Sequence, residues 1–133
     1  MSVKDLVVVG IGSSAGGLEA LQVMLSKLSE NLNCSYIIAQ HLSPTHRSMM
    51  VDLLSRITNI PVIEVQNGMV IKAKTIYMTP ENTDIFISNG RIYLKSIEHT
   101  YGPKPSVNYF FNSLAQSYGS KSIGIILSGT GSD

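Results

Sequence analysis

The sequence is poor in residues on which several classes of protein depend. Its 133 residues include one cysteine, Cys34, and no tryptophan, and charged residues make up only 14%. A single cysteine excludes an internal disulfide and a cysteine-based metal cluster, and it favours a reducing, cytoplasmic setting. No apolar run reaches the roughly 18 residues that a transmembrane helix needs. Ten Lys and Arg against nine Asp and Glu give a net charge of +1, which offers no sign of a nucleic-acid-binding surface.

Apolar residues, by contrast, make up 44% of the chain and fall into short runs. Continuous runs at residues 6–11, 36–39 and 62–65 indicate strands that are buried on both faces. Between them, apolar residues recur at helical spacing from 18 to 28 and from 49 to 57, which predicts two amphipathic helices. This alternation of strand and helix is typical of a parallel sheet covered by helices.

The middle of the chain departs from that alternation. Short apolar runs at residues 76–78, 85–87 and 92–94 predict three further strands. Asn89-Gly90 lies between the last two, and this dipeptide favours a two-residue turn between antiparallel strands. We therefore expect a β-hairpin in this region.

The last third predicts an amphipathic helix over residues 107–118 and a buried strand over 123–127. The whole pattern indicates an α/β fold in one domain: three layers, with a mostly parallel, doubly wound sheet and an antiparallel β-hairpin at one edge. A glycine-rich turn after a buried strand normally leads into a covering helix, and none follows in residues 128–133. We therefore expect the domain, residues 1–133, to be incomplete at its C-terminus.

The glycine-rich segment after the first strand is open to two interpretations. Residues 10–15, Gly-Ile-Gly-Ser-Ser-Ala, fit the G-x-G-x-x-A pattern of a dinucleotide-binding loop. That function also requires Asp or Glu at the end of the second strand to hold a ribose, and this chain has Gln40-His41 there. The dinucleotide interpretation therefore lacks its second requirement, although the loop pattern itself remains.

Residues 12–16, Gly-Ser-Ser-Ala-Gly, also fit G-x-S-x-G, the pattern of a nucleophile elbow. In that turn Ser14 takes the apex, and the small residues beside it let the turn close and the substrate approach. The helix that follows directs free N–H groups toward developing negative charge. A glycine-rich turn that only packs a helix on a sheet, with no chemistry, stays open for this pattern alone.

A nucleophilic serine needs a base, and the base needs an acid that orients it. His41 follows the second strand and Asp133 ends the segment after the last strand, so both belong to the carboxyl edge of the sheet with Ser14. His46 lies in a loop or in the first turn of a helix, and His99 lies in a polar loop. Both are more simply surface or hydrogen-bonded structural residues. The sequence thus predicts a Ser14–His41–Asp133 triad, with no metal ion and no organic cofactor.

Five stretches in this order carry a family resemblance: VVVGIGSSAGGLEAL, IIAQHLSP, IYMTPEN, KPSVNYFFNSLA and IGIILSGTGSD. With them the chain resembles the catalytic domain of CheB-type protein-glutamate methylesterases. QHLSPTHRS and SGTGSD are similar to the form that is fused to a CheR-type methyltransferase and PAS modules. The resemblance departs from the family at Thr130, where members often have Met, and at Lys104, where they often have Arg.

The resemblance implies hydrolysis of glutamate methyl esters on chemotaxis receptors or similar signalling proteins, and in many members deamidation of receptor glutamines. It implies the same three catalytic residues, Ser14, His41 and Asp133, with the backbone N–H groups of Ala15 and Thr130 binding the oxyanion. It implies a cytoplasmic protein without cofactor, metal, nucleic acid or membrane insertion. The alternatives are a catalytically silent sensory or interaction module of the same fold, and a dinucleotide-binding domain.

Overall fold

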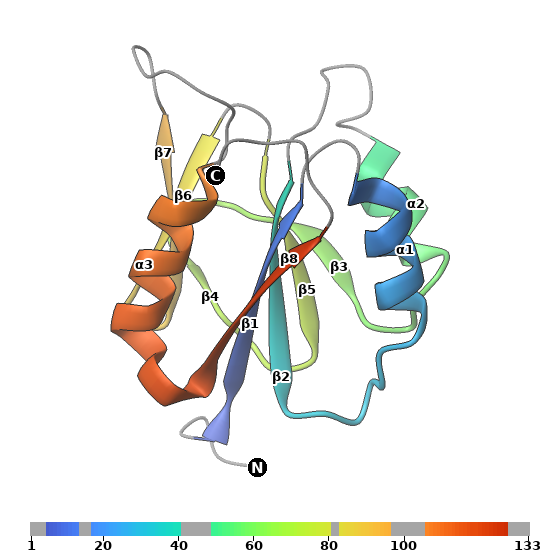
Figure 1. The fold of residues 1–133 in the computed structure, drawn as a ribbon, viewed down its shortest axis with the longest axis horizontal. Helices are drawn as coiled ribbons and strands as arrows, with labels where there is room; N and C mark the ends of the chain where they lie inside the picture. The colour runs from blue at the N-terminus through green and yellow to red at the C-terminus, as the bar shows by residue number, and fades with distance from the viewer. Residues whose placement is uncertain (1–4, 14–16, 41–48, 81–82, 97–105, 128–133) are drawn as a thin grey trace.

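The computed structural model describes residues 5–13, 17–40, 49–80, 83–96 and 106–127 (Figure 1). A five-stranded sheet of parallel strands runs through its centre in the order β3-β5-β2-β1-β8. The strands are β1 (Val7–Ser13), β2 (Cys34–Gln40), β3 (Val62–Glu64), β5 (Thr75–Met78) and β8 (Ser122–Leu127). The predicted α/β fold with a mostly parallel sheet is confirmed.

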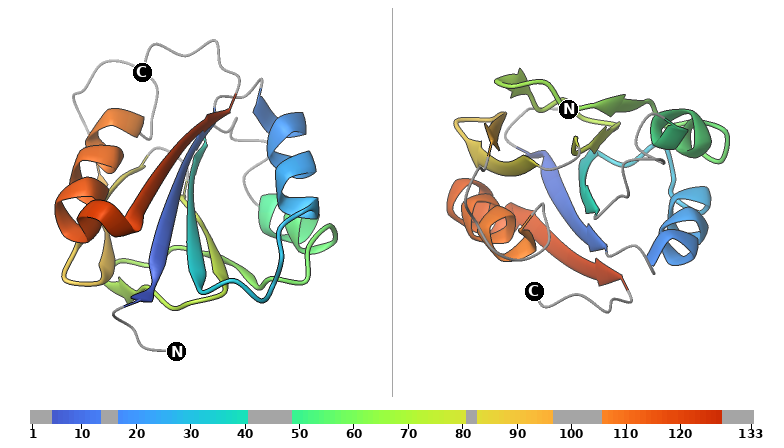
Figure 2. Two further views of the ribbon diagram at one scale, coloured as in Figure 1. Left: turned by 60° about the horizontal axis from the view of Figure 1, so that its bottom comes forward. Right: turned by 90° about the horizontal axis from the view of Figure 1, so that it is seen from above.

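Helices cover both faces of this sheet, as the two views in Figure 2 show. On one side lie α1 (Leu18–Ser26) and α2 (Met50–Ser55), and on the other lies α3 (Val107–Tyr118) together with a second, smaller sheet. Gly119, with a φ of 52°, ends α3, and a 3-10 turn, Gly119–Lys121, leads into β8. The three predicted layers are therefore present.

The central strands read as continuous apolar runs because successive side chains enter opposite layers. In β2, Ile37 belongs to the core beneath α3, whereas Ile38 belongs to the core beneath α1 and α2. Tyr77 and Met78 of β5 divide in the same way. Period-2 side-chain alternation on a strand buried on both faces leaves no position for a polar residue in its middle.

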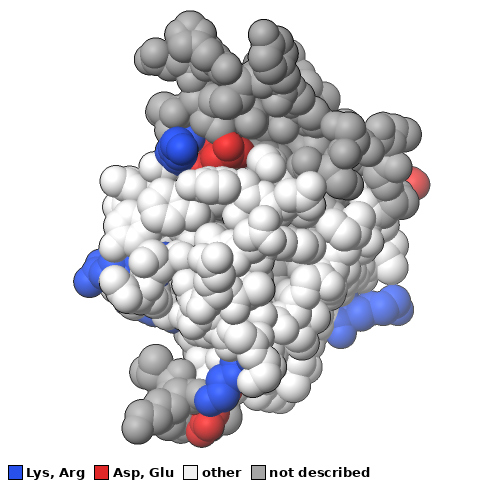
Figure 3. Space-filling model, turned by 60° about the vertical axis from the view of Figure 1, so that its left-hand side comes forward, with Lys and Arg blue, Asp and Glu red and all other residues white. Residues whose placement is uncertain are grey.

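The predicted hairpin forms, but it does not extend the five-stranded sheet. Strands β6 (Thr83–Ser88) and β7 (Arg91–Ser96) pair antiparallel, and β7 also pairs with β4 (Met69–Val70), a two-residue strand that the sequence did not indicate. Asn89 and Gly90 have φ values of 52° and 73°, as a two-residue hairpin turn requires. The outer side of this layer is largely uncharged (Figure 3).

Helix α3 occupies the position that would otherwise extend the β6 edge. The Ser113 hydroxyl accepts a hydrogen bond from the backbone N–H of Ile87 at 2.9 Å, and the Ser117 hydroxyl donates to the Ile87 carbonyl at 2.9 Å. These side chains satisfy backbone groups that an open strand edge leaves unpaired. The small sheet is separate from the large one, with α3 beside its β6 edge and β4 as its other edge strand.

Glycines in β1 let α3 approach the sheet closely. A Cβ atom built on Gly12 would lie 2.7 Å from Cγ1 of Val107, and one on Gly10 would lie 2.8 Å from Cδ2 of Leu114. Both glycines lie within β1, which continues to Ser13 rather than ending at residue 11 as predicted. Helix packing thus accounts for the first two glycines of the G-x-G-x-x-A pattern, and the dinucleotide interpretation loses its basis.

Replacing Gly12 with alanine is expected to destabilise the fold by about 1–3 kcal/mol, because the new methyl group overlaps Val107 and α3 must shift. Urea denaturation of the single variant measures the loss. The double variant Gly12→Ala/Val107→Ala removes both methyl groups of Val107 and should lose less than the sum of the two single losses. Strictly additive losses would contradict a direct contact at this position.

The last strand differs from its prediction in its exposure. β8 lies at the end of the sheet, and in the described part of the chain no strand pairs with its outer edge. Ile123 and Ile126 are 49% and 60% exposed, whereas a buried strand was expected. An apolar run alone does not distinguish a central strand from an end strand, because both need β-branched residues on at least one packed face.

Burial raises the pKa of Tyr36 from its ordinary value of 10.0 to about 12, and the neighbouring Cys34 adds to the shift by charge and by a hydrogen bond. Because folding raises this pKa, the stability that the neutral phenol contributes is complete below pH 10 and is lost as the pH rises through about 12. In an alkaline titration followed at 295 nm, we expect a late ionisation step that Tyr36→Phe removes. A Tyr36→Phe variant that keeps the last step would contradict this assignment.

Candidate active site

The carboxyl ends of three strands meet at one level of the sheet. In the β1–β2 register Ser13 pairs with Gln40, and in the β1–β8 register Ser13 pairs with Leu127. Each of these is the last residue of its strand. Segments that leave the three strands therefore start from neighbouring positions, although residues 13, 40 and 127 lie far apart in the chain.

Buried polar side chains gather at this edge. Ser13 is 3% exposed, Gln40 is 2% exposed, and Thr79, directly after β5, is 1% exposed. The Thr79 hydroxyl donates to the Ile38 carbonyl at 2.7 Å, and the Thr79 backbone N–H donates to the same oxygen at 3.1 Å. Polar groups are costly to bury. Because three of them gather at the ends of adjacent strands, this edge of the sheet is the candidate for the active site.

Gln40 contains a buried acceptor. Its Oε1 atom accepts no hydrogen bond from any of the residues that the structure describes. A buried unsatisfied polar atom costs about 1–3 kcal/mol and calls for a functional or structural reason. Sequence reasoning used Gln40 only as evidence against a ribose-binding acid. The sequence feature that could have identified Gln40 is a long polar side chain at the end of a run that is otherwise apolar.

Two helix N-termini approach the same edge. α3 begins there because Val107 packs over Gly12, near the end of β1. The Ser106 backbone N–H donates to Oδ1 of Asp84 at 2.6 Å, and the Ser106 hydroxyl accepts from the backbone N–H of Tyr109 at 3.3 Å. These bonds satisfy two donors that a helix start leaves free. The N-cap residue of α1, in contrast, is Gly17, which has no side chain that could accept from the first N–H groups of the helix.

The five predicted site residues, Ser14, Ala15, His41, Thr130 and Asp133, lie outside the described residues. The structure does describe the residue before Ser14 and the residue before His41. Ser14 directly follows Ser13, and His41 directly follows Gln40, in the sequence. Since Ser13 and Gln40 are paired, the chain reaches both predicted catalytic positions from one rung of the sheet.

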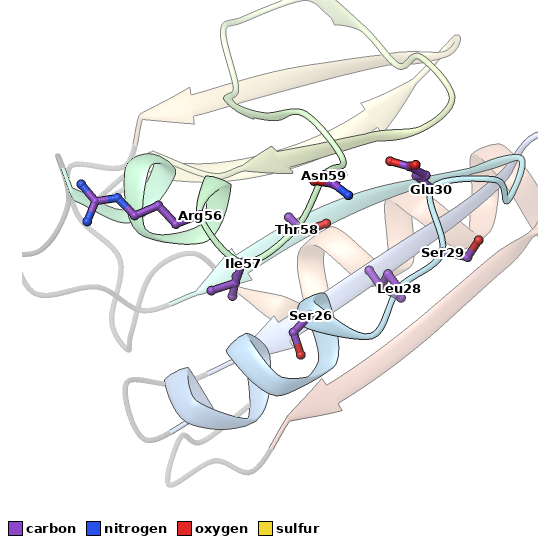
Figure 4. Close-up of a pocket in the computed structure, with 8 residues that line it drawn as sticks. All are labelled: Ser26, Leu28, Ser29, Glu30, Arg56, Ile57, Thr58 and Asn59. Atoms are coloured by element: carbon purple, nitrogen blue, oxygen red, sulfur yellow. The ribbon is translucent and has the colours of Figure 1, made fainter.

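A hollow lies between the C-terminal ends of α1 and α2, away from the carboxyl edge (Figure 4). It has a volume of about 400 Å³, and its lining includes Ser26, Glu30, Arg56 and Asn59. The Ser26 hydroxyl donates to the Val23 carbonyl at 2.7 Å, and no histidine lines the hollow. Lacking a nucleophile with an adjacent base, it is a weaker candidate for catalysis than the carboxyl edge.

Within the described residues, no three His, Cys, Asp or Glu side chains lie together in a group that could hold a metal ion. Every helix in that part of the chain is too short or too polar to span a bilayer.

Comparison with known proteins decides the family. The model of the CheB methylesterase family matches residues 9–133. The chain belongs to this family. Its fold is also that of the CheB methylesterase catalytic domain of Thermotoga maritima, whose crystal structure matches with a TM-score of 0.83 and 27% identity over 96% of this chain and 69% of that one.

Curated relatives of the CheB family have names that state an enzymatic activity. A protein-glutamate methylesterase/protein-glutamine glutaminase of Syntrophus aciditrophicus is 34% identical over 98% of the chain, and one of Methanospirillum hungatei is 35% identical over 95%. The chain spans 37% of the length of the first and 40% of the second. It therefore corresponds to one part of these longer proteins.

Proposed function

We propose that the chain hydrolyses the methyl esters of protein glutamate side chains and deamidates protein glutamines. The observation that carries the proposal is the pairing of Ser13 with Gln40, because it brings the positions before Ser14 and His41 to one rung. Family membership and the names of the relatives supply the reaction class. The uncapped start of α1, beside the same edge, suits a reaction that develops negative charge.

The proposed mechanism is acyl transfer to water. His41 takes the proton of the Ser14 hydroxyl as Ser14 attacks the side-chain carbonyl carbon. The backbone N–H groups of Ala15 and Thr130 bind the oxyanion, at roughly 3–4 kcal/mol for each donor. His41 returns the proton to the leaving methanol or ammonia, and then activates water to hydrolyse the acyl-enzyme. Asp133 orients His41 and stabilises its protonated form.

The proposed substrates are methylated chemotaxis receptors or similar signalling proteins in the cytoplasm. A CheR-type methyltransferase and PAS modules in the same protein are further proposed partners, supported by the QHLSPTHRS and SGTGSD segments. The proposed reaction needs no cofactor.

Labelling with a fluorophosphonate probe tests the proposed nucleophile. We expect a covalent adduct on the peptide that contains Ser14, found by mass spectrometry after digestion, because only an activated serine attacks such a probe. Heat-denatured protein serves as the control and should give no adduct. The 133-residue chain is expected to be incomplete and can be inactive for that reason, so the test uses the longer natural protein. If that protein is folded and stays unlabelled at Ser14, it supports a silent module with the same fold.

A further inference from the structure

Three aromatic side chains form a row on the outer side of the small sheet and α3. Phe86 of β6 stacks on Tyr93 of β7, with ring centroids 5.2 Å apart and planes at 19°. Tyr109 of α3 meets Phe86 edge to face at 6.2 Å. We call these three residues the aromatic row. They are a third of the nine Phe and Tyr residues of the chain, which has no tryptophan.

The row faces outward because of strand alternation. Ile85 and Ile87 of β6 and Ile92 of β7 point into the core, so Phe86 and Tyr93 take the opposite side of the sheet. Ser113 and Ser117 fasten α3 beside β6, as described above. The surface is therefore continuous from β7 across β6 to α3, and Tyr109 remains 38% exposed on it.

Basic side chains outnumber acidic ones in the part of the chain that forms this surface. Residues 83–96 and 106–118 contain three charged side chains, Asp84, Arg91 and Lys95. Asp84 is 5% exposed and accepts from the Ser106 N–H, whereas Arg91 and Lys95 are exposed. Figure 3 shows this side of the molecule as a broad uncharged surface with charged atoms confined to its margins.

The two basic side chains lie on the outer side of β7, with Tyr93 between them. Lys95 places its Nζ atom over the Tyr109 ring, 5.5 Å from the centroid, and Arg91 donates to the Gly68 carbonyl at 2.8 Å. Four residues of strand separate their Cα atoms by about 13 Å. Rings flanked by cations at that spacing suit an extended segment with an apolar residue midway between two carboxylates that are about four positions apart.

The aromatic row ends at the first turn of α3, which lies near the carboxyl end of β1. Tyr109 lies in the first turn of α3, two residues after Val107, which packs over Gly12 of β1. Gly12 precedes Ser14 by two residues. A polypeptide bound along the row would therefore extend toward the carboxyl edge of the large sheet.

We propose that the aromatic row, with Lys95 and Arg91, is a docking site for an acidic segment of the protein substrate. Carboxylates of the segment pair with Lys95 and Arg91, and its apolar side chains pack on Tyr109 and Phe86. The identification of this segment as part of the substrate rests on the proposed function. A protein whose glutamate side chains are methylated and then hydrolysed back to carboxylates is acidic around the reacting position.

Aromatic rings beside cations on a sheet can also bind single-stranded nucleic acid by stacking bases. Here Phe86 and Tyr93 stack on each other, and the chain's net charge is only +1, so a polypeptide is favoured. Nucleic acid is therefore tested as the competing ligand.

Fluorescence anisotropy on the 133-residue chain tests the docking site. The probes are a fluorescein-labelled peptide rich in Glu, Leu and Ala, a counterpart with Gln for each Glu, and a labelled oligouridylate. We expect the Glu peptide to bind about tenfold more tightly than the Gln peptide at low salt, with the preference falling as salt rises. Lys95→Glu and Tyr109→Ser should each weaken binding of the Glu peptide by about tenfold.

Matched variants control for charge and for loss of an exposed apolar side chain. Lys72→Glu changes the same charge at an exposed position outside the row, and Val23→Ser changes a residue of α1 that is 57% exposed. Both should bind the Glu peptide like the unchanged chain. Circular dichroism confirms that each variant is folded.

Equal binding of the Glu and Gln peptides would overturn the proposal, and so would equal losses in Lys95→Glu and Lys72→Glu. Binding of the oligouridylate without binding of the Glu peptide would do the same. The fluorophosphonate experiment judges the catalytic proposal separately. A chain that binds the Glu peptide as expected but stays unlabelled at Ser14 has the docking site without the reaction. A chain that is labelled at Ser14 but does not bind the Glu peptide as expected contradicts the docking site alone.

Discussion

Replacing Ser14 with alanine is expected to lower kcat for glutamate methyl ester hydrolysis by on the order of 10⁴–10⁶-fold. The hydroxyl is the proposed attacking group, and water in the same site would react without forming an acyl-enzyme. Methanol released from a methylated receptor fragment measures the rate. Because the hydroxyl acts in the chemical step, KM should change much less than kcat.

Ser26→Ala is the matched control for this variant. Ser26 ends α1, and its hydroxyl donates only to the Val23 carbonyl of its own helix at 2.7 Å. Its removal should leave kcat unchanged. If Ser14→Ala retained a kcat within about tenfold of the unchanged protein, Ser14 could not be the nucleophile.

The position of the candidate site could be predicted because it depends on strand ends. Continuous apolar runs mark the parallel strands, and the carboxyl ends of parallel strands share one edge. The observed pairing of Ser13 with Gln40 and Leu127 bears out that expectation for the described residues. The triad of Ser14, His41 and Asp133 remains a prediction.

The buried polar residues at this edge could not be predicted in the same way. Gln40 and Thr79 follow apolar runs, and polar residues in such places are usually the first residues of a solvated loop. Their burial is 98–99% complete only because other segments cover them, which is a property of the whole fold. Those long-range contacts cannot be predicted from the sequence of one strand.

The separate small sheet shows the same limit. Asn89-Gly90 fixes the hairpin turn locally, so the sequence predicted it correctly. The edges of that hairpin are set by contacts with α3 and β4, which lie far away in the chain. Because β4 has only two residues, it offers no periodicity to detect, and the hairpin was assigned to the edge of the large sheet instead.

Phe110→Ala is expected to destabilise the fold by about 3–5 kcal/mol, the largest loss among the substitutions considered for stability. The side chain is fully buried in the core beneath α3, and its ring lies 3.1 Å from the place where a Cβ atom of Gly10 would stand. Neither the glycine nor the backbone of β1 can fill the space that the ring leaves. Urea denaturation at 25 °C measures the change in the free energy of unfolding.

Asn108→Ala supplies the matched control, since Asn108 is an exposed residue of the same helix. Its effect should stay within about 0.5 kcal/mol. A loss below about 1 kcal/mol for Phe110→Ala would mean that this ring does not hold α3 on β1. The position of α3 on β1 would then depend on Val107 over Gly12 and on the bond from Ser106 to Asp84 at the N-terminal end of the helix.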